Sequence, residues 1–178
     1  VSFAAECQNI RNDTLRLHIL ANSDTQEDQR LKLLVRDRIL KDYAFLFDGT
    51  SDKSLAIHRV RTHLDEIVQS ARKVLLENGC DTQVSAQVVN MYFDTRVYEN
   101  FTMPAGMYDA LRIVIGRGQG HNWWCVMFPP MCIPGAASSD SAQECYTPGE
   151  QQVLCASPQY EARFFLVELF EKVKSWMQ

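Results

Sequence analysis

The chain has no apolar run long enough to cross a membrane. The longest, residues 123–131, falls well short of the ~20 residues that span a bilayer, and two prolines interrupt it. We therefore expect the residues as given to form a soluble domain. They begin with Val1 and not with Met, so we expect a native N-terminal signal or anchor segment to precede them.

The chain also lacks an excess of basic residues. Its 18 Lys and Arg residues are outnumbered by 22 Asp and Glu, which gives a net charge of −4 at pH 7. Proteins that bind nucleic acids usually carry a strong positive field. We therefore expect no nucleic-acid partner.

No pair of cysteines has the CxxC spacing, so the usual signature of zinc ribbons and thioredoxin-like redox sites is missing. The even number of scattered cysteines is typical of a disulfide framework in an exported protein, with many pairings open. The alternative is six thiols in a cytosolic protein. The cysteines are Cys7, Cys80, Cys125, Cys132, Cys145 and Cys155.

The glycine-rich stretch from Gly116 to Gly120 resembles a phosphate-binding loop only superficially. A dinucleotide fingerprint needs a helix after the glycines, and a P-loop needs a Lys-Ser/Thr pair. Here a tryptophan-rich strand follows instead. We interpret the stretch as a turn whose glycines adopt positive φ.

The pattern of apolar residues predicts one α+β domain over residues 1–178. Alternation predicts a half-buried strand over residues 14–22, and Ser23 or Asp24 is suited to cap a helix that runs to about Phe47. A second long helix spans about residues 52–77, and its charged outer face is interpreted as solvated. Residues 1–13 show no clear period.

Further strands are expected over residues 82–94, 110–115 and 123–128. We expect the last two to form a long-looped hairpin. Residues 133–158 are expected to be irregular, and a final helix covers about residues 158–177. The expected fold is a mostly antiparallel or mixed sheet of about four strands, packed with two long helices and a C-terminal helix.

Two groups of residues invite a chemical interpretation. His121 and Cys125 lie about 13 Å apart on a strand, too far for a catalytic dyad, although either can meet a distant partner such as His18. A cysteine- or metal-dependent hydrolase of the cell envelope is therefore the alternative function. His18, Asn22, Ser23 and Asp24 cluster at a strand end, where they either cap the next helix or form the floor of a binding site.

One block is distinctive enough to indicate a family. Residues 106–132, which contain GRGQGHNWWCVMFPPMC, resemble the stage II sporulation protein R family of endospore-forming bacteria. Residues 16–24 (RLHILANSD), the following EDQRLKLLVRD, residues 103–106 and residues 163–170 agree with the same pattern.

The resemblance implies an exported signalling protein and not an enzyme. Such proteins are secreted from the forespore into the space between forespore and mother cell. There they activate a membrane-bound aspartic protease that removes the pro-sequence of sigma-E. On this interpretation we expect no cofactor and no metal, and a soluble domain that acts at a membrane surface.

We expect the recognition residues in the unusual block, with the strand-end cluster as a second candidate surface. Because Cys125 and Cys132 both belong to the block, the resemblance implies a bond between them, and with it we expect the pairs Cys145–Cys155 and Cys7–Cys80. The candidate partner-binding residues are Arg117, His121, Asn122, Trp123 and Trp124, followed by His18, Asn22 and Asp24.

Overall fold

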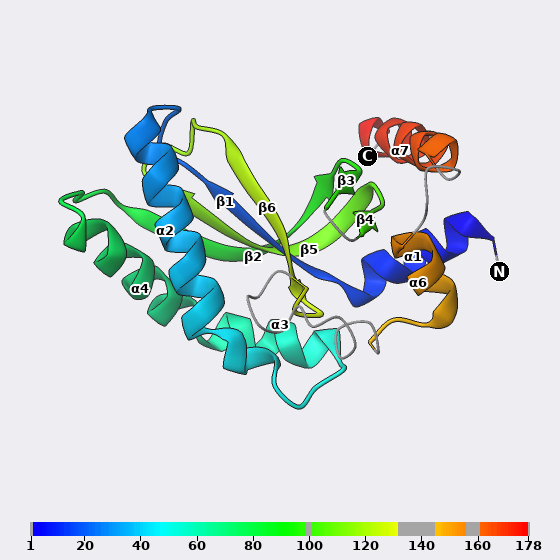
Figure 1. The fold of residues 1–178 in the computed structure, drawn as a ribbon, viewed down its shortest axis with the longest axis horizontal. Helices are drawn as coiled ribbons and strands as arrows, with labels where there is room; N and C mark the ends of the chain where they lie inside the picture. Colours follow the sequence, from blue (N-terminus) through cyan, green and yellow to red (C-terminus); the bar gives the residue numbers. More distant parts are fainter. Residues whose placement is uncertain (1, 99–100, 132–144, 156–160, 178) are drawn as a thin grey trace.

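Segments that are far apart in the sequence meet in one mixed sheet (Figure 1). The computed structural model describes residues 2–98, 101–131, 145–155 and 161–177. In chain order the elements are α1 (Phe3–Asp13), β1 (Leu15–Leu20), α2 (Gln26–Asp42), the 3-10 helix η1 (Ala44–Phe47), α3 (Lys53–Thr62), α4 (Leu64–Glu77), β2 (Val84–Phe93), β3 (Arg96–Val97), β4 (Thr102–Met103), β5 (Gly106–Ile115), β6 (Asn122–Phe128), α6 (Pro148–Leu154) and α7 (Glu161–Trp176).

The four-stranded sheet has the order β2-β5-β1-β6. Strand β1 is parallel to β5 and antiparallel to β6, and β2 is antiparallel to β5. The α+β class and the four strands confirm the prediction. The expected hairpin of β5 and β6 is wrong, because β1 lies between these two strands and pairs with both.

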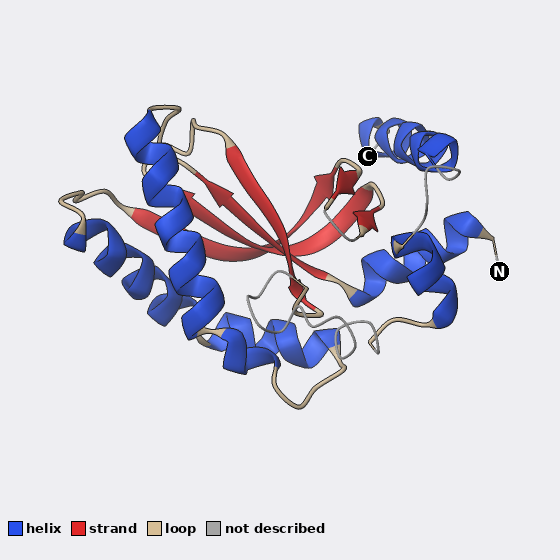
Figure 2. Cartoon of the chain, in the orientation of Figure 1, coloured by secondary structure: helices blue, strands red, loops and turns tan. Residues whose placement is uncertain are grey.

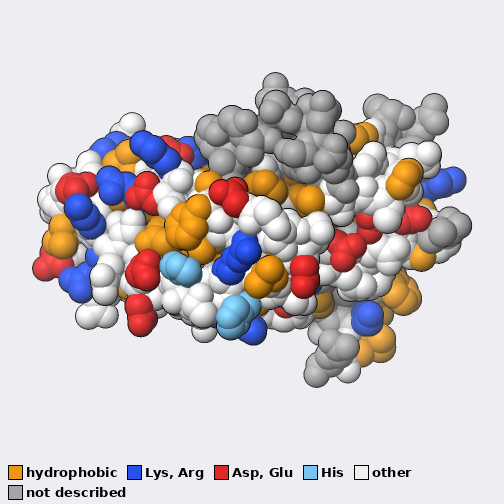
Figure 3. Space-filling model, turned by 90° about the horizontal axis from the view of Figure 1, so that it is seen from below, with side chains coloured by type: hydrophobic (Ala, Val, Ile, Leu, Met, Phe, Trp, Pro, Cys, Tyr) orange, Lys and Arg blue, Asp and Glu red, His pale blue; other side chains and the backbone are white. Residues whose placement is uncertain are grey.

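One face of the sheet packs against α2, α3 and α4, which Figure 2 shows as a curved helical layer. Alternate strand residues such as Leu17, Ile19 and Ile113 point into this core, where they meet Val35 and Ile39 of α2. The apolar stripes predicted from helical periodicity are buried here. The outer face of the helices carries interspersed acidic and basic side chains (Figure 3), as expected of a solvated surface.

Both long helices are shorter than predicted. The first ends at Asp42 and continues as η1, and the second is divided at His63, whose N–H donates to the Val60 carbonyl three residues back. The cap of α2 is Thr25 and not Ser23 or Asp24, because the Asp28 N–H donates to the Thr25 hydroxyl. Ser23 and Asp24 are thereby available for other contacts.

A second core lies on the opposite face, at the end of the sheet near α1 and α6. Residues 1–13, which show no period in the sequence, form α1 after residue 2, because Cys7 and Ile10 are buried here against Tyr108 and Val126. Strand β1 is consequently buried on both faces, and the prediction of a half-buried strand is wrong. Even Arg16 and His18 are almost completely enclosed.

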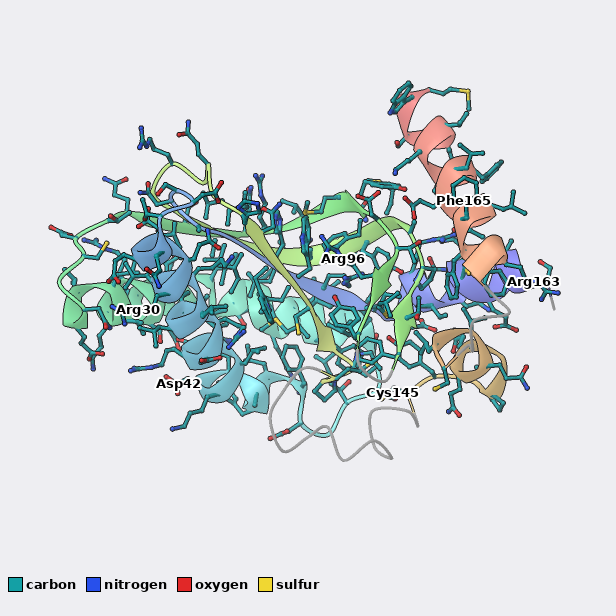
Figure 4. The ribbon with its side chains drawn as sticks, turned by 45° about the horizontal axis from the view of Figure 1, so that its top comes forward. Arg30, Asp42, Arg96, Cys145, Arg163 and Phe165 are labelled. Atoms are coloured by element: carbon teal, nitrogen blue, oxygen red, sulfur yellow. The ribbon has the colours of Figure 1, made fainter. Side chains whose placement is uncertain are left out.

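The C-terminal helix α7 is present as predicted, but most of its apolar face is exposed. Phe165, Leu169, Val173 and Trp176 share that face, and Figure 4 shows Phe165 pointing away from the rest of the molecule. Of the segment expected to be irregular, residues 148–154 form α6, with a capping box between Thr147 and Glu150. Residues 132–144 and 156–160 lie outside the described part.

Candidate functional site

Two loops that are about 95 residues apart in the sequence meet at one edge of the sheet. Because β1 and β5 are parallel, their carboxyl ends reach the same edge, and antiparallel β6 begins there. Residues 21–25 follow β1, and residues 116–122 follow β5 and open β6. We call these two segments the loop junction.

Backbone and side-chain hydrogen bonds join the two segments of the loop junction. Four of them are donated by backbone N–H groups of residues 117–121. Gly120 donates to the Ala21 carbonyl (2.9 Å), Gln119 to the Asn22 carbonyl (3.2 Å), Arg117 to Asn22 Oδ1 (3.0 Å) and His121 to Asp24 Oδ1 (2.6 Å). The two candidate surfaces predicted separately from the sequence are therefore one surface.

The glycines permit this close contact. A Cβ atom on Gly120 would lie 2.2 Å from the Ser23 carbonyl oxygen, and one on Gly116 would lie 2.3 Å from Asn22 Oδ1. Gly116 also has a φ of +56°, which side-chain-bearing residues rarely adopt. The glycine-rich stretch is therefore a turn that packs against residues 21–25. No helix follows it, in agreement with the rejection of a phosphate loop.

Acidic side chains hold the polar groups of the loop junction. Asp24 accepts from both the backbone and the ring Nδ1 of His121, and these hydrogen bonds lower the pKa of its carboxyl group. Asp28 accepts from the Ser23 hydroxyl at 2.5 Å and the Asn22 amide at 2.9 Å, and its pKa is lowered mainly by the hydroxyl. The strand-end cluster therefore joins the two loops, and the alternative that it caps α2 is wrong, because Thr25 is the cap.

The His121 ring remains accessible although it is paired. Its side chain is 80% exposed, and the His121 carbonyl accepts from Lys32 Nζ of α2 at 2.9 Å. Arg117 is exposed as well, whereas Asn22 is tied into the loops. The surface that the loop junction offers to a partner is thus made of Arg117, His121 and the first residue of β6, Asn122.

The two tryptophans of β6 point to opposite faces of the sheet, as predicted. Trp123 packs against the helical core under the guanidinium group of Arg36, 4.3 Å from the ring centroid. Trp124 stacks on the His18 ring with centroids 4.0 Å apart, and Phe93 meets it edge-on at 4.9 Å. Both indoles are partly exposed, so each presents an aromatic edge at the surface.

His18 is held as a neutral ring under Trp124. Its Nε2 lies 2.9 Å from Asn122 Oδ1, and because an amide oxygen only accepts, Nε2 carries the proton. Nδ1 is buried without a hydrogen-bond partner among the described residues. Burial lowers the pKa of His18, since a second ring proton would face this enclosed space.

Beside Trp124 lies a buried arginine that the sequence pattern does not single out. Arg16 is fully enclosed, and its guanidinium group lies 4.4 Å from the Phe93 ring centroid and 5.1 Å from that of Tyr108. It donates to the Cys125 carbonyl at 3.2 Å and the Tyr98 hydroxyl at 2.8 Å. No carboxylate pairs with it within the described ranges. In the sequence, Arg16 alternates with Leu15 and Leu17, which suggests an exposed side chain. No residue near it in the sequence indicates that it is buried.

A hollow of about 520 Å3 runs along the outer edge of β6. It is lined by residues 122–125 of β6, by residues 36, 37 and 40 of α2, and by residues 96–98. Successive strand side chains point to opposite faces, so four consecutive residues line one hollow only where it follows the strand's edge. We call it the edge groove. In Figure 4, β6 passes between α2 and Arg96.

The cysteines match the expected framework only in part. Cys125 is disulfide-bonded, while its expected partner Cys132 lies outside the described residues. The pairs Cys7–Cys80 and Cys145–Cys155 are not formed, because these four are thiols. Cys7 packs in the second core and Cys80 against the first, and α6 separates Cys145 from Cys155. Burial raises the pKa of the Cys7 thiol to about 12.

The residues considered for catalysis or metal binding lie in separate environments among the described residues. Over the described ranges, no three His, Cys, Asp or Glu residues gather closely enough to hold a metal ion. His121 and Cys125 belong to the same strand region but not to one site: His121 pairs with Asp24, and Cys125 carries no thiol. Over the same ranges no helix has the length and apolar character of a membrane span.

Similarity to known proteins identifies the family of the chain. The family model described as Stage II sporulation protein R matches residues 11–138. Stage II sporulation protein R of Bacillus subtilis (strain 168) is 35% identical over 135 residues, which cover 76% of this chain and 60% of that relative. The chain thus spans about three fifths of the length of the curated relative. No solved structure matches.

Proposed function

Since the chain belongs to the stage II sporulation protein R family, we propose that it is an exported signalling protein that activates a membrane-embedded aspartic protease of the mother cell. It is secreted from the forespore into the space between forespore and mother cell. Its signal triggers removal of the pro-sequence of sigma-E during sporulation. It performs no chemistry itself.

The family match over residues 11–138 carries this proposal, because that span contains the whole loop junction and β6. The loop junction adds a surface for recognition: a rigid turn that presents Arg117, His121 and Asn122 beside two partly exposed indoles. Trp and Arg are the residue types that dominate binding energy at protein interfaces. The disulfide at Cys125 supports export, since such bonds persist in oxidising compartments.

The cysteine-hydrolase alternative loses its nucleophile. A thiolate is the attacking species in such enzymes, and Cys125 is disulfide-bonded. His18 is stacked beneath Trp124, with Nε2 engaged by Asn122, so it is not presented to a substrate as a base. These observations favour recognition over catalysis at this site.

Activation requires that the domain bind the active state of the protease more tightly than the inactive state. Shifting a population from about 1:99 to about 99:1 takes a ~10⁴-fold difference in affinity. Such a preference calls for a rigid surface with several contacts. The hydrogen bonds and close glycine contacts of the loop junction give the turn that rigidity.

Co-expression with the protease and pro-sigma-E tests the proposal, with processed sigma-E measured by immunoblot. The double variant His121→Ala, Asn122→Ala is expected to fold and to lose most processing. Gln69→Ala, an exposed position on α4, is the matched control and is expected to process normally. Full processing by the double variant would remove these two residues from the recognition surface, and no processing by the unmodified chain would refute the proposed function.

A further inference from the structure

The edge groove combines aromatic surfaces with an excess of positive charge. Arg36 lies over Trp123 at 4.3 Å and Arg96 over Trp124 at 5.5 Å, each measured to the ring centroid. The first comes from α2 and the second from β3, so the two cations stand on opposite walls. Aromatic rings and arginines therefore line both sides of a channel that follows β6.

The charges in and beneath the edge groove do not balance. Arg36 is paired with Asp37 at 2.7 Å. Neither Arg96 nor the buried Arg16 beneath Tyr98 pairs with a carboxylate among the described residues. Among the described residues that line the groove, the two guanidinium groups of Arg36 and Arg96 thus accompany one carboxylate, that of Asp37, in a chain whose net charge is −4. This local surplus favours a negatively charged occupant.

We propose that the edge groove binds an extended, acidic segment of the partner protein, with a carboxylate on Arg96 and apolar side chains against Trp123 and Trp124. This inference deepens the proposed function and rests on it for the source of the segment. A carboxylate on the open guanidinium face of Arg96 forms a charge-assisted hydrogen bond, the stronger kind at interfaces. An extended chain fits because the groove follows a strand.

Side chains, and not a continuous backbone ladder, hold the segment. The Tyr98 hydroxyl already donates to the Trp124 carbonyl at 3.2 Å and accepts from Arg16 at 2.8 Å. The buried Arg16 therefore fixes Tyr98, and Tyr98 occupies the edge of β6 at that point. A second copy of this chain is the less favourable occupant, since pairing two edge grooves brings Arg36 and Arg96 close to their counterparts.

The probe is the blocked peptide Ac-Val-Glu-Val-Glu-Val-NH2, titrated into the ¹⁵N-labelled chain and followed by NMR. We expect saturable shifts of the Trp123 and Trp124 indole N–H signals, while that of Trp176 on α7 stays unchanged. The uncharged match Ac-Val-Gln-Val-Gln-Val-NH2 is expected to bind at least about tenfold more weakly, because it lacks the charge-assisted bond. Raising the salt concentration should weaken only the acidic peptide.

Arg96→Gln is the decisive variant, since Arg96 is exposed and its loss should not impair folding. It should abolish the preference for the acidic peptide, and Arg96→Glu should reverse it in favour of Ac-Val-Lys-Val-Lys-Val-NH2. Arg163→Gln on α7 is the matched control and should bind as the unmodified chain does. Equal binding of the Glu and Gln peptides by the unmodified chain, or a preference for the Glu peptide that survives Arg96→Gln, overturns the inference.

Two further outcomes separate this inference from the proposed function. If Arg96→Gln loses the preference for the acidic peptide but still supports sigma-E processing, the groove does not receive the protease and the inference fails while the function stands. If the unmodified chain binds the peptide but activates nothing, the proposed function fails. Concentration-dependent dimerisation in sedimentation velocity that the acidic peptide does not reverse would assign the groove to a second copy, and would also overturn the inference.

Discussion

Gly120→Ala tests whether the loop junction is held together by close backbone contact. The added Cβ would lie 2.2 Å from the Ser23 carbonyl oxygen, whereas ordinary contacts begin at 3.4 Å. The two segments must therefore separate by about 1 Å, and hydrogen bonds weaken steeply over that distance. The bonds directly affected are those from Gly120 to Ala21 and from Gln119 to Asn22, at 2.9 and 3.2 Å.

Each of these two backbone bonds contributes about 1 kcal/mol to stability. Their loss costs about 2 kcal/mol, and the smaller conformational freedom of the unfolded alanine chain offsets about 0.5 kcal/mol. The net destabilisation of about 1.5 kcal/mol corresponds to a fall in Tm of roughly 3–6 °C for a chain of this length.

Thermal unfolding followed by near-UV circular dichroism measures this change in Tm. Gly49→Ala is the control, because Gly49 has a φ of +66° but no heavy atom lies within 4 Å of the position that a Cβ would take there. It carries only conformational strain, about 1 kcal/mol, partly offset in the unfolded chain, so its Tm should fall by about 1–2 °C. If the Tm of Gly120→Ala equals that of the unmodified chain, the close contact does not hold the junction.

Three further predictions concern His18, Asp24 and the cysteines. Burial lowers the pKa of His18, so the unfolded chain binds a proton at this residue before the folded chain does as the pH falls below about 6.5. The free energy of unfolding should therefore decrease from that pH down to the folded pKa. In urea unfolding, His18→Phe should show a weaker dependence of this free energy on pH. The Asp24 carboxyl should titrate by NMR below 3.8, with its midpoint returning toward that value in His121→Ala; an unchanged midpoint would refute the pairing. Alkylation in denaturant without reductant should modify Cys7, Cys80, Cys145 and Cys155 but not Cys125, and intact-mass analysis would show any deviation.

The sequence predicted the elements whose periodicity is strong. The apolar stripes of α2, α3 and α4 correspond to buried faces and the alternation in β2 to a partly buried one, because a helix or strand must bury its apolar side wherever it packs. Helix α1 escaped prediction because Cys7 and Ile10 stand among polar residues. The break between α3 and α4 at His63 was not predicted, because the apolar positions keep nearly the same helical period on both sides of the break.

The candidate site was predicted residue by residue but not as an arrangement. Local motifs drew attention to His121, Asn122 and the tryptophans on one side, and to His18, Asn22 and Asp24 on the other. Their union depends on β1 entering the sheet between β5 and β6, which local sequence does not encode. Arg16, Arg36 and Arg96 were missed for the same reason, since each acquires its role from a neighbour distant in the chain.

What the sequence determined by itself is local: a glycine-rich turn, and apolar residues at the period of each helix or strand. Only the tertiary structure decided which strands are neighbours and therefore which loops share an edge. The physical reason is that strand pairing and burial of a charge such as Arg16 depend on contacts across the whole chain, and periodicity carries information only about one element at a time.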